Sequence, residues 1–278
     1  MLIIELLKAL LYGIVEGITE WLPVSSTGHL ILLDEFCKLD VSEAFFEMFE
    51  VVIQLGAILA VIVLFFHKLN PFAPSKTAVE KKNTWGLWFR VLVAVVPSAV
   101  VGVLLDDWLD TYLYHYVTVA VALVVYGVVF IVIERIKPSD RATVTDVGGI
   151  TYKLAFLIGM FQMLALIPGT SRSGSTIIGA MLLGLSRGAA AEFSFFMAIP
   201  TMAGASLLKV VKLACEGVSI TPTEWGVLAV GCVTAFVVSL VAIKFLMEFV
   251  KKHSFSSFGV YRIILGVLVL GYFFLFGR

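Results

Sequence analysis

Six long runs of apolar residues constrain the fold of this chain more than any other feature of its sequence. They cover residues 45–66, 88–105, 116–133, 190–211, 225–247 and 260–276. Each is close to the length of about 20 residues that an α-helix needs to cross the hydrocarbon core of a bilayer. Charged residues make up only 14% of the chain, against about a quarter in soluble domains. We therefore expect an all-α, polytopic integral membrane protein with six full transmembrane spans.

The remaining composition limits the kinds of partner and of processing. Basic and acidic residues number 20 each, so a net charge of zero gives no reason to expect a nucleic-acid partner. The three cysteines, Cys37, Cys215 and Cys232, are odd in number and lack metal-site spacing, so we interpret them as small apolar side chains. Glu5 and Lys8 interrupt the apolar N-terminal segment, and no signal-peptidase site follows. We expect this segment to be retained as a first helix.

Two further stretches are apolar but broken in the middle. Residues 10–33 are interrupted by Pro23 and residues 152–185 by Pro168, and each proline is followed by hydroxyl and glycine residues. Proline breaks the hydrogen-bond ladder of a helix, and a run of Ser, Thr and Gly favours the start of a new one. Non-helical backbone at membrane depth is tolerated only inside protein or beside a wet cavity. The pattern predicts two re-entrant hairpins of half-length helices.

The two broken stretches resemble each other. Residues 21–28 align with residues 166–174 if the second copy carries one extra residue. A full span follows each, with Glu47 or Glu50 near the start of one and Glu192 near the start of the other. Three full spans in each half require the second half to be inverted in the membrane. We expect one membrane domain, residues 1–278, with inverted repeats at 1–136 and 150–278 whose breaks meet near the midplane.

The basic residues gather on one side of the predicted spans. This side holds Lys68, Lys76, Lys81, Lys82, Arg90, Arg135, Lys137, Arg141, Lys153, Arg187, Lys251 and Lys252. The opposite side holds Lys38, Lys209 and Lys212 and an acidic turn of Asp106, Asp107 and Asp110. Because basic loops stay in the cytoplasm, both termini should lie outside. The first broken stretch then opens to the external side of the membrane.

The first break carries a dense set of polar groups. Glu16 and Glu20 are four residues apart and share a helix face, so they should share a proton or bind a divalent cation such as Mg²⁺ or Ca²⁺. Ser25, Ser26 and Thr27 follow the proline, where hydroxyls and free backbone N–H groups can bind an anion. One of these hydroxyls could attack a substrate.

A histidine completes the first group. His29 stands three residues beyond Ser26 and could act as base, acid or nucleophile. It could also be a packing residue, but two neighbouring glutamates favour a functional role. The other histidines, His67, His115 and His253, lie near span ends, and we assign them to the interface or to loops.

The second break supplies a positive charge. Residues 168–176 combine two glycines with several hydroxyls and Arg172. The guanidinium fork suits phosphate oxygens, and an arginine at membrane depth is costly unless it is paired. If the breaks meet, Arg172 faces the Glu16, Glu20 and His29 group. Together they would form a phosphate clamp for phosphoryl transfer, which needs positioning and charge stabilisation above all.

Several of these polar residues have a structural interpretation of equal weight. Hydroxyls in membrane helices often only cap or back-bond to the helix, and this applies to Ser25, Thr27, Ser171, Ser173 and Thr176. Gln54 and Gln162, deep in apolar runs, either line the cavity or hydrogen-bond between helices, and we favour the cavity.

The two motifs together resemble the undecaprenyl-diphosphate phosphatase family, also called the bacitracin-resistance family. The similarity rests on EGITEWLPVSSTGHL at residues 16–30 and PGTSRSGST at 168–176, and extends to FEVVIQLGAILAV at 49–61 and AAEFSFFMAIP at 190–200. The resemblance implies an enzyme of the bacterial plasma membrane with inverted repeats, re-entrant helix pairs and an active site open to the external, periplasmic side. Such an enzyme hydrolyses undecaprenyl diphosphate to undecaprenyl phosphate and inorganic phosphate, which recycles the lipid carrier for peptidoglycan synthesis and confers bacitracin resistance.

The resemblance also implies residue roles. The family's glutamate pair falls on Glu16 and Glu20, its essential serine on Ser26, its histidine on His29 and its arginine on Arg172. It further implies a divalent cation, Mg²⁺ or Ca²⁺. We therefore expect catalysis by Glu20, Ser26, His29 and Arg172, metal binding by Glu16 and Glu20, and substrate binding by Ser25, Thr27, Ser171, Ser173, Thr176 and Gln54. The nucleophile could be Ser26, His29 or water.

Two alternatives remain open at this point. Inverted repeats with broken helices are also the general pattern of secondary transporters, so the chain could carry a polyprenyl phosphate across the bilayer. The small residues Gly13 and Gly17 permit close helix contacts, and a homodimer is therefore possible. The expected partners are the lipid diphosphate, membrane lipids and a second copy of the chain.

Overall fold

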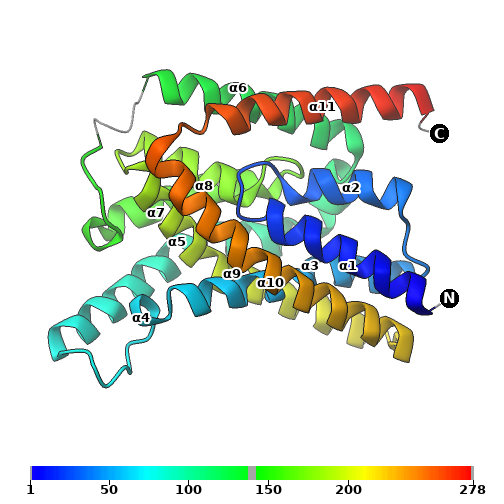
Figure 1. Cartoon of the computed structure of the whole chain (residues 1–278), viewed down its shortest axis with the longest axis horizontal. Coiled ribbons are helices and arrows are strands. Elements are labelled where there is room, and N and C mark those ends of the chain that lie inside the picture. Colours follow the sequence, from blue (N-terminus) through cyan, green and yellow to red (C-terminus); the bar gives the residue numbers. More distant parts are fainter. Residues whose placement is uncertain (1, 137–141, 277–278) are drawn as a thin grey trace.

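The computed structural model describes residues 2–136 and 142–276, and for Asp106, Asp107 and Asp110 the backbone alone. In this part the chain is helical, as the sequence predicts (Figure 1). The helices are α1 (Leu2–Thr19), α2 (Ser26–Phe36), α3 (Glu43–Leu64), α4 (Phe66–Leu69), α5 (Ala78–Leu113), α6 (Tyr116–Ile136), η2 (Val147–Gly149), α7 (Tyr152–Gln162), η3 (Met163–Leu166), α8 (Arg172–Leu182), α9 (Arg187–Cys215), α10 (Pro222–Lys252) and α11 (Ser256–Phe276).

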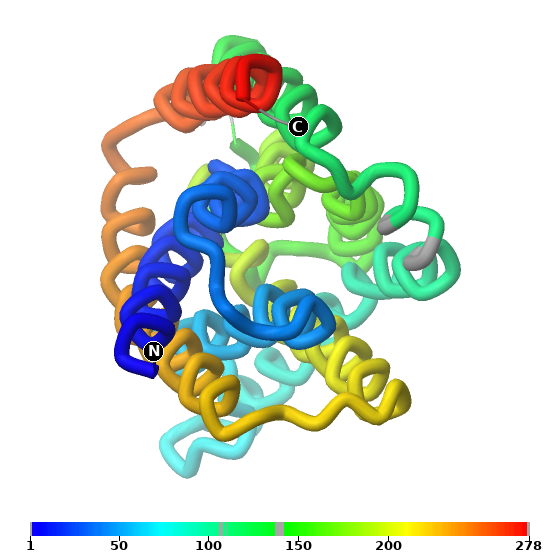
Figure 2. The backbone as a smooth tube through the Cα atoms, turned by 90° about the vertical axis from the view of Figure 1, so that its right-hand side faces the viewer, coloured from blue at the N-terminus to red at the C-terminus, as the bar shows by residue number. Residues whose placement is uncertain are grey.

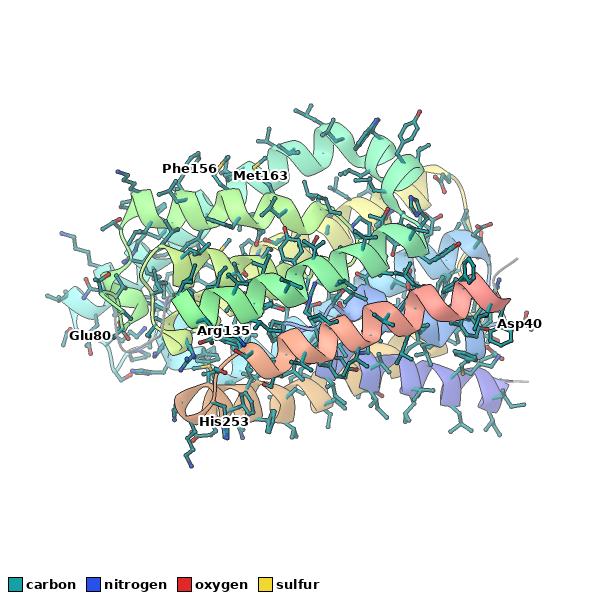
Figure 3. All side chains as sticks on the ribbon, turned by 90° about the horizontal axis from the view of Figure 1, so that it is seen from above. Asp40, Glu80, Arg135, Phe156, Met163 and His253 are labelled. Carbon is teal, nitrogen blue, oxygen red and sulfur yellow. The ribbon has the colours of Figure 1, made fainter. Side chains whose placement is uncertain are left out.

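Six helices in the described part are long and apolar enough to cross a membrane, and they contain the six predicted runs except for Phe65 and Phe66, which follow the end of α3 at Leu64. The six helices are α3, α5, α6, α9, α10 and α11. The largest difference is at α5, which begins ten residues before the apolar run because Thr77 and Glu80 form a capping box there. Lys81 and Lys82 therefore lie on a helix and not in a loop. Large apolar side chains project from the outer faces of these helices (Figure 3), as a lipid environment requires.

The ends of the bundle carry the residues that determine orientation. Figure 3 places Glu80, Arg135 and His253 at one end and Asp40 at the other, in agreement with the predicted side of each loop. The beginning of α1 and the end of α11 lie at the same end of the bundle (Figure 1), which is the end where Figure 3 places Asp40. The predicted acidic turn is instead helical, because α5 continues to Leu113. The side chains of this segment's aspartates, together with Lys137 and Arg141, lie outside the described residues.

Both broken stretches show the predicted pattern of helix, break and helix. α1 stops at Thr19 and α2 starts at Ser26, while α7 and η3 stop at Leu166 and α8 starts at Arg172. The two new helices begin alike. Ser25 and Ser171 have φ of 72° and 73°, and they alone among the described non-glycine residues have positive φ. Each serine hydroxyl accepts from the backbone N–H three residues on, at Gly28 and Gly174.

Close helix crossings bring distant segments together. α1 packs along α10 and α6 along α11 (Figures 1 and 2). A Cβ at Gly13 would lie 2.6 Å from the Gly231 carbonyl oxygen, and one at Gly17 would lie 2.8 Å from that of Ala235. These small residues therefore serve contacts within the chain. They give no support to the predicted homodimer, which stays a prediction.

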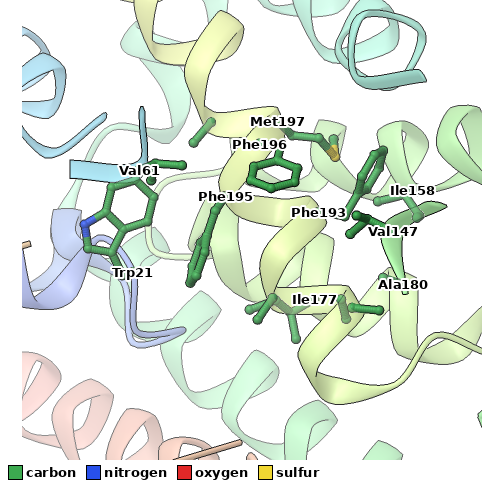
Figure 4. Packing of buried hydrophobic residues seen from close by; sticks show 14 of the residues in the cluster. Trp21, Val61, Val147, Ile158, Ile177, Ala180, Phe193, Phe195, Phe196 and Met197 are labelled. Carbon is green, nitrogen blue, oxygen red and sulfur yellow. The ribbon is translucent and has the colours of Figure 1, made fainter. Parts of the chain in front are cut away.

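The main apolar core surrounds the first break. Trp21, next to Glu20, is fully buried and meets Phe195 of α9 edge to face, with ring centroids 5.2 Å apart (Figure 4). Phe196 and Met197 continue this cluster toward α7 and α8. Burial of an aromatic ring at this point anchors the backbone that carries Glu20.

Candidate active site

The two breaks meet, as predicted, and side-chain donors connect them through backbone carbonyl oxygens. The Ser173 hydroxyl, in the first turn of α8, donates to the Glu20 carbonyl oxygen at 3.0 Å and approaches that of Leu22 at 3.4 Å. From α11, Arg262 donates to the carbonyl oxygens of both breaks. Its Nη1 reaches Pro23 at 3.2 Å, and its Nη2 reaches Gly169 and Thr170 at 2.8 and 2.9 Å.

Glu20 is the centre of the site. Its Oε2 accepts from the Ser26 hydroxyl at 2.9 Å. Its Oε1 accepts from Arg172, with Nε at 3.3 Å and Nη2 at 3.1 Å. The side chains of Arg172 and Glu20 are only 10% and 6% exposed, so this ion pair is largely removed from solvent. A hydroxyl that donates to a buried carboxylate has a proton acceptor already in place.

Arg172 has a second anchor. Its Nη1 donates to the Ser194 backbone oxygen at 2.8 Å, and the Ser194 hydroxyl lies 3.3 Å away. The Thr176 hydroxyl lies 2.7 Å from the same hydroxyl and 2.8 Å from the Arg172 carbonyl oxygen. The guanidinium is therefore held in one orientation between α1 and α9.

Glu16 is the one carboxylate of this group without a donor. It is fully buried, and neither of its carboxylate oxygens has a hydrogen-bond partner among the described residues. Glu20 follows it by one helical turn, with the Glu20 N–H donating to the Glu16 carbonyl oxygen at 3.0 Å. The charged side chains close enough to interact electrostatically with Glu16 are those of Glu20, Glu50 and Arg172. A buried carboxylate with free oxygens requires a proton or a cation.

The donor set at this point fits a hard divalent cation only in part. Glu16 and Glu20 offer the oxygen ligands that Mg²⁺ and Ca²⁺ prefer. The described residues contain no group of three or more His, Cys, Asp or Glu side chains placed to hold a metal. A cation bound here would therefore depend on other oxygens, such as those of a phosphate substrate and water.

Four of the other predicted site residues make hydrogen bonds of a structural kind. Ser25 and Ser171 cap α2 and α8, and Ser173 and Thr176 donate to backbone carbonyls. Thr27 and Gln54 are half-buried. These contacts do not test a role in substrate binding, which stays a prediction.

The structure corrects the predicted role of Gln162. We expected it to line the cavity, but its Nε2 donates to the Ser98 hydroxyl at 2.6 Å and to the Thr201 hydroxyl at 3.2 Å. These residues belong to α5 and α9, so the amide joins helices. A buried amide in an apolar bundle takes the hydroxyls that packing brings nearest.

His29 lies beside the site but is not hydrogen-bonded to Ser26. Its Nδ1 is 2.7 Å from the Ser25 carbonyl oxygen, and its Nε2 is 2.6 Å from the Tyr261 hydroxyl of α11. Both ring nitrogens are therefore engaged elsewhere. In this arrangement Glu20, and not His29, is placed to take the proton of Ser26.

Comparison with known proteins shows the family to which this chain belongs. The family model described as Bacitracin resistance protein BacA matches residues 9–268. The chain belongs to the BacA family. It is 56% identical over 272 residues to an undecaprenyl-diphosphatase of Enterococcus faecalis, covering 98% of this chain and 99% of the relative. It is 58% identical over 273 residues to undecaprenyl-diphosphatase 1 of Clostridioides difficile, covering 98% of each. The predicted resemblance is confirmed.

Three residues at this BacA-family site were missed by sequence reasoning. Ser194 stands within a motif that carried the resemblance, but nothing in its spacing points to Arg172. Tyr261 resembles any interfacial tyrosine. Arg262, in contrast, could have been predicted from the sequence, because an arginine inside an apolar span is costly and usually functional. It is fully buried.

Proposed function

We propose that this protein hydrolyses undecaprenyl diphosphate to undecaprenyl phosphate and inorganic phosphate. This reaction recycles the lipid carrier for peptidoglycan synthesis and confers bacitracin resistance. The observation that carries the proposal is the buried Glu20 carboxylate, which accepts from the Ser26 hydroxyl and from the Arg172 fork. The names of the relatives favour hydrolysis over the carrier function that an inverted repeat would also permit.

The chain's own side chains support a two-step reaction. Ser26 Oγ attacks the terminal phosphorus and passes its proton to Glu20, and the bond from that phosphorus to the bridging oxygen breaks. The lipid monophosphate takes that proton from Glu20 as it leaves, and the phosphoryl group stays on Ser26. Glu20, again a carboxylate, then takes a proton from water, whose oxygen attacks the phosphorus. The bond from phosphorus to Ser26 Oγ breaks, Oγ takes the proton back from Glu20, and inorganic phosphate is released. Arg172 stabilises the charge on the phosphoryl oxygens because its guanidinium is held rigidly by Ser194.

Glu16 and Glu20 would hold the divalent cation that the family resemblance implies. A cation supplies positive charge that neutralises phosphate oxygens during phosphoryl transfer. The free oxygens of Glu16 support this assignment, because the described residues offer them no other partner. Chelation should therefore remove activity, and re-addition of Mg²⁺ or Ca²⁺ should restore it. Unchanged activity after exhaustive chelation would contradict the assignment.

The proposed setting is the bacterial plasma membrane, with the site open to the external side. The clustering of Arg135 and His253 at the end opposite Asp40 supports this orientation (Figure 3). The matching caps at Ser25 and Ser171 support two repeats whose re-entrant breaks enter from opposite faces. In a chain whose three native cysteines are replaced by alanine, a membrane-impermeant thiol reagent should label Asp40→Cys in intact cells and His253→Cys only after permeabilisation.

Phosphate release by the purified protein tests the activity. The protein in detergent micelles should release inorganic phosphate from undecaprenyl diphosphate, whereas a carrier would bind and exchange the lipid without hydrolysis. Rapid quenching during turnover should trap a phosphoserine at residue 26. Ser26→Ala should lower kcat by at least about a thousandfold.

Ser239→Ala is the matched control for the nucleophile. Ser239 is also fully buried, and its hydroxyl donates to the Gly17 carbonyl oxygen, away from Glu20. It should retain wild-type kcat. If Ser26→Ala keeps most of its turnover, the serine route is wrong, and a phosphohistidine at His29 or direct attack by water becomes the mechanism.

A further inference from the structure

The hydrogen bonds of His29 define which of its nitrogens carries a proton. The Ser25 carbonyl oxygen, 2.7 Å from Nδ1, can only accept, so Nδ1 carries a hydrogen. In the neutral ring Nε2 is then an acceptor, and the Tyr261 hydroxyl at 2.6 Å donates to it. The two rings are nearly parallel, with an angle of 6° between them. Tyr261 and His29 therefore form one coupled unit.

Protonation of the ring reverses the hydrogen bond. In the imidazolium both nitrogens donate, so Nε2 donates to the Tyr261 oxygen and the tyrosine O–H is free for another acceptor. An anion beside the pair favours this state because opposite charges attract. Burial of the ring and the positive charge of Arg262 both oppose its protonation, so an anion that offsets this charge is needed to favour the imidazolium. The atoms nearest a Cβ at the neighbouring Gly28 belong to the apolar Val119 and Leu123 of α6. The pair can thus present a hydroxyl donor to an anion.

The position of the pair matches the second phosphate of a lipid diphosphate. His29 is three residues beyond Ser26 on α2, a rise of about 5 Å along the axis, which is of the same order as the separation of the two phosphates. Tyr261 is 45% exposed, whereas Arg262, the next residue of α11, is fully buried. The pair therefore joins the helix that carries Ser26 to a side chain that is partly open to its surroundings.

We propose that Tyr261, together with His29, binds the phosphate that remains on the lipid, while Arg172 and Glu20 serve the terminal phosphate. The inference rests on the proposed function, because it divides that substrate between two subsites. Tyr261 is then a substrate-binding residue that selects a lipid-linked phosphate. It takes no part in bond breaking.

Binding of two separate probes tests the division. The measurements use the full-length protein in detergent. All variants also carry Ser26→Ala, so that no phosphoserine can form. Farnesyl monophosphate represents the lipid-linked phosphate, and inorganic phosphate represents the terminal one. Calorimetry gives the Kd of farnesyl monophosphate. Displacement of bound farnesyl diphosphate by inorganic phosphate gives the Kd of inorganic phosphate. Tyr261→Phe should raise the Kd of farnesyl monophosphate about tenfold, since one hydrogen bond to a charged group is lost, and should leave that of inorganic phosphate unchanged.

Tyr272→Phe is the matched control. Tyr272 is on the same helix, and its hydroxyl also donates to α2, at Glu35, with a distance of 3.3 Å. This variant should change neither Kd. Equal changes of both Kd values in Tyr261→Phe would mean that the tyrosine only supports α2, and a Kd for farnesyl monophosphate equal to that of the control would also overturn the proposal. Failure of the wild type to release phosphate contradicts the proposed function alone, because the binding comparison needs no turnover.

Discussion

Arg262 should be the residue whose loss disturbs both halves of the site at once. It is fully buried and donates three hydrogen bonds, to Pro23 in the first break and to Gly169 and Thr170 in the second. Hydrogen bonds from a charged donor contribute about 1.5–3 kcal/mol each, so the three together contribute roughly 5–9 kcal/mol. Burial of the charge offsets several kcal/mol of this. Arg262→Met should therefore lower the free energy of unfolding by about 2–4 kcal/mol.

The activity should fall more steeply than the stability. Pro23 is three residues from Ser26, and Thr170 is two residues from Arg172. A displacement of about 1 Å in such positions costs about a hundredfold in rate. Arg262→Met should lose at least that factor in kcat/KM, measured per folded protein, with a melting temperature about 5–15 °C lower. Thermal unfolding and phosphate release on the same preparation give both quantities.

Arg90 provides the matched control. From α5 it also reaches three backbone carbonyls, those of Val147, Gly148 and Ile150, at 3.5, 2.9 and 2.7 Å. None of these belongs to the site. Arg90→Met should lose stability but keep kcat/KM per folded protein. If Arg262→Met and Arg90→Met have the same kcat/KM within about threefold, the reasoning that Arg262 positions both breaks is refuted.

Two further predictions concern the base and the helix crossings. Glu20→Gln should lower kcat by about 10²–10⁴, since it removes the proton acceptor of Ser26. Glu248→Gln, which removes an exposed pair with a lysine, should change nothing in the same phosphate-release assay. Gly56→Ala should destabilise the protein by about 1–3 kcal/mol, because the new Cβ would overlap the Cys232 carbonyl where α3 crosses α10. Gly204→Ala, with nothing within 4 Å of the new Cβ, should melt at or above the wild-type temperature; equal melting of both glycine variants would contradict the crossing argument.

The membrane fold could be predicted from the sequence because the features that indicate it, apolar runs and prolines, are local. A run of about 20 apolar residues predicts a span wherever its partners lie, and each of the six predicted runs coincides with one long apolar helix, apart from two residues beyond the end of α3. Pro23 and Pro168 predicted both breaks for the same reason, since a proline acts on its own helix. The ends of the helices were predicted less accurately. The start of α5 is an example, because the capping box at Thr77 lies outside the apolar run.

The sequence by itself determined the class of the protein and the two broken stretches. Through its motifs it also predicted that Glu20, Ser26 and Arg172 belong to one site. Only the tertiary structure decided how that group is connected. It placed Arg172 on Glu20 across 152 positions of sequence, engaged His29 with Tyr261 instead of Ser26, and gave Gln162 to a helix interface. The physical reason is that hydropathy and helix breaking depend on neighbouring residues, whereas the partner of a buried polar group depends on which helices pack against it.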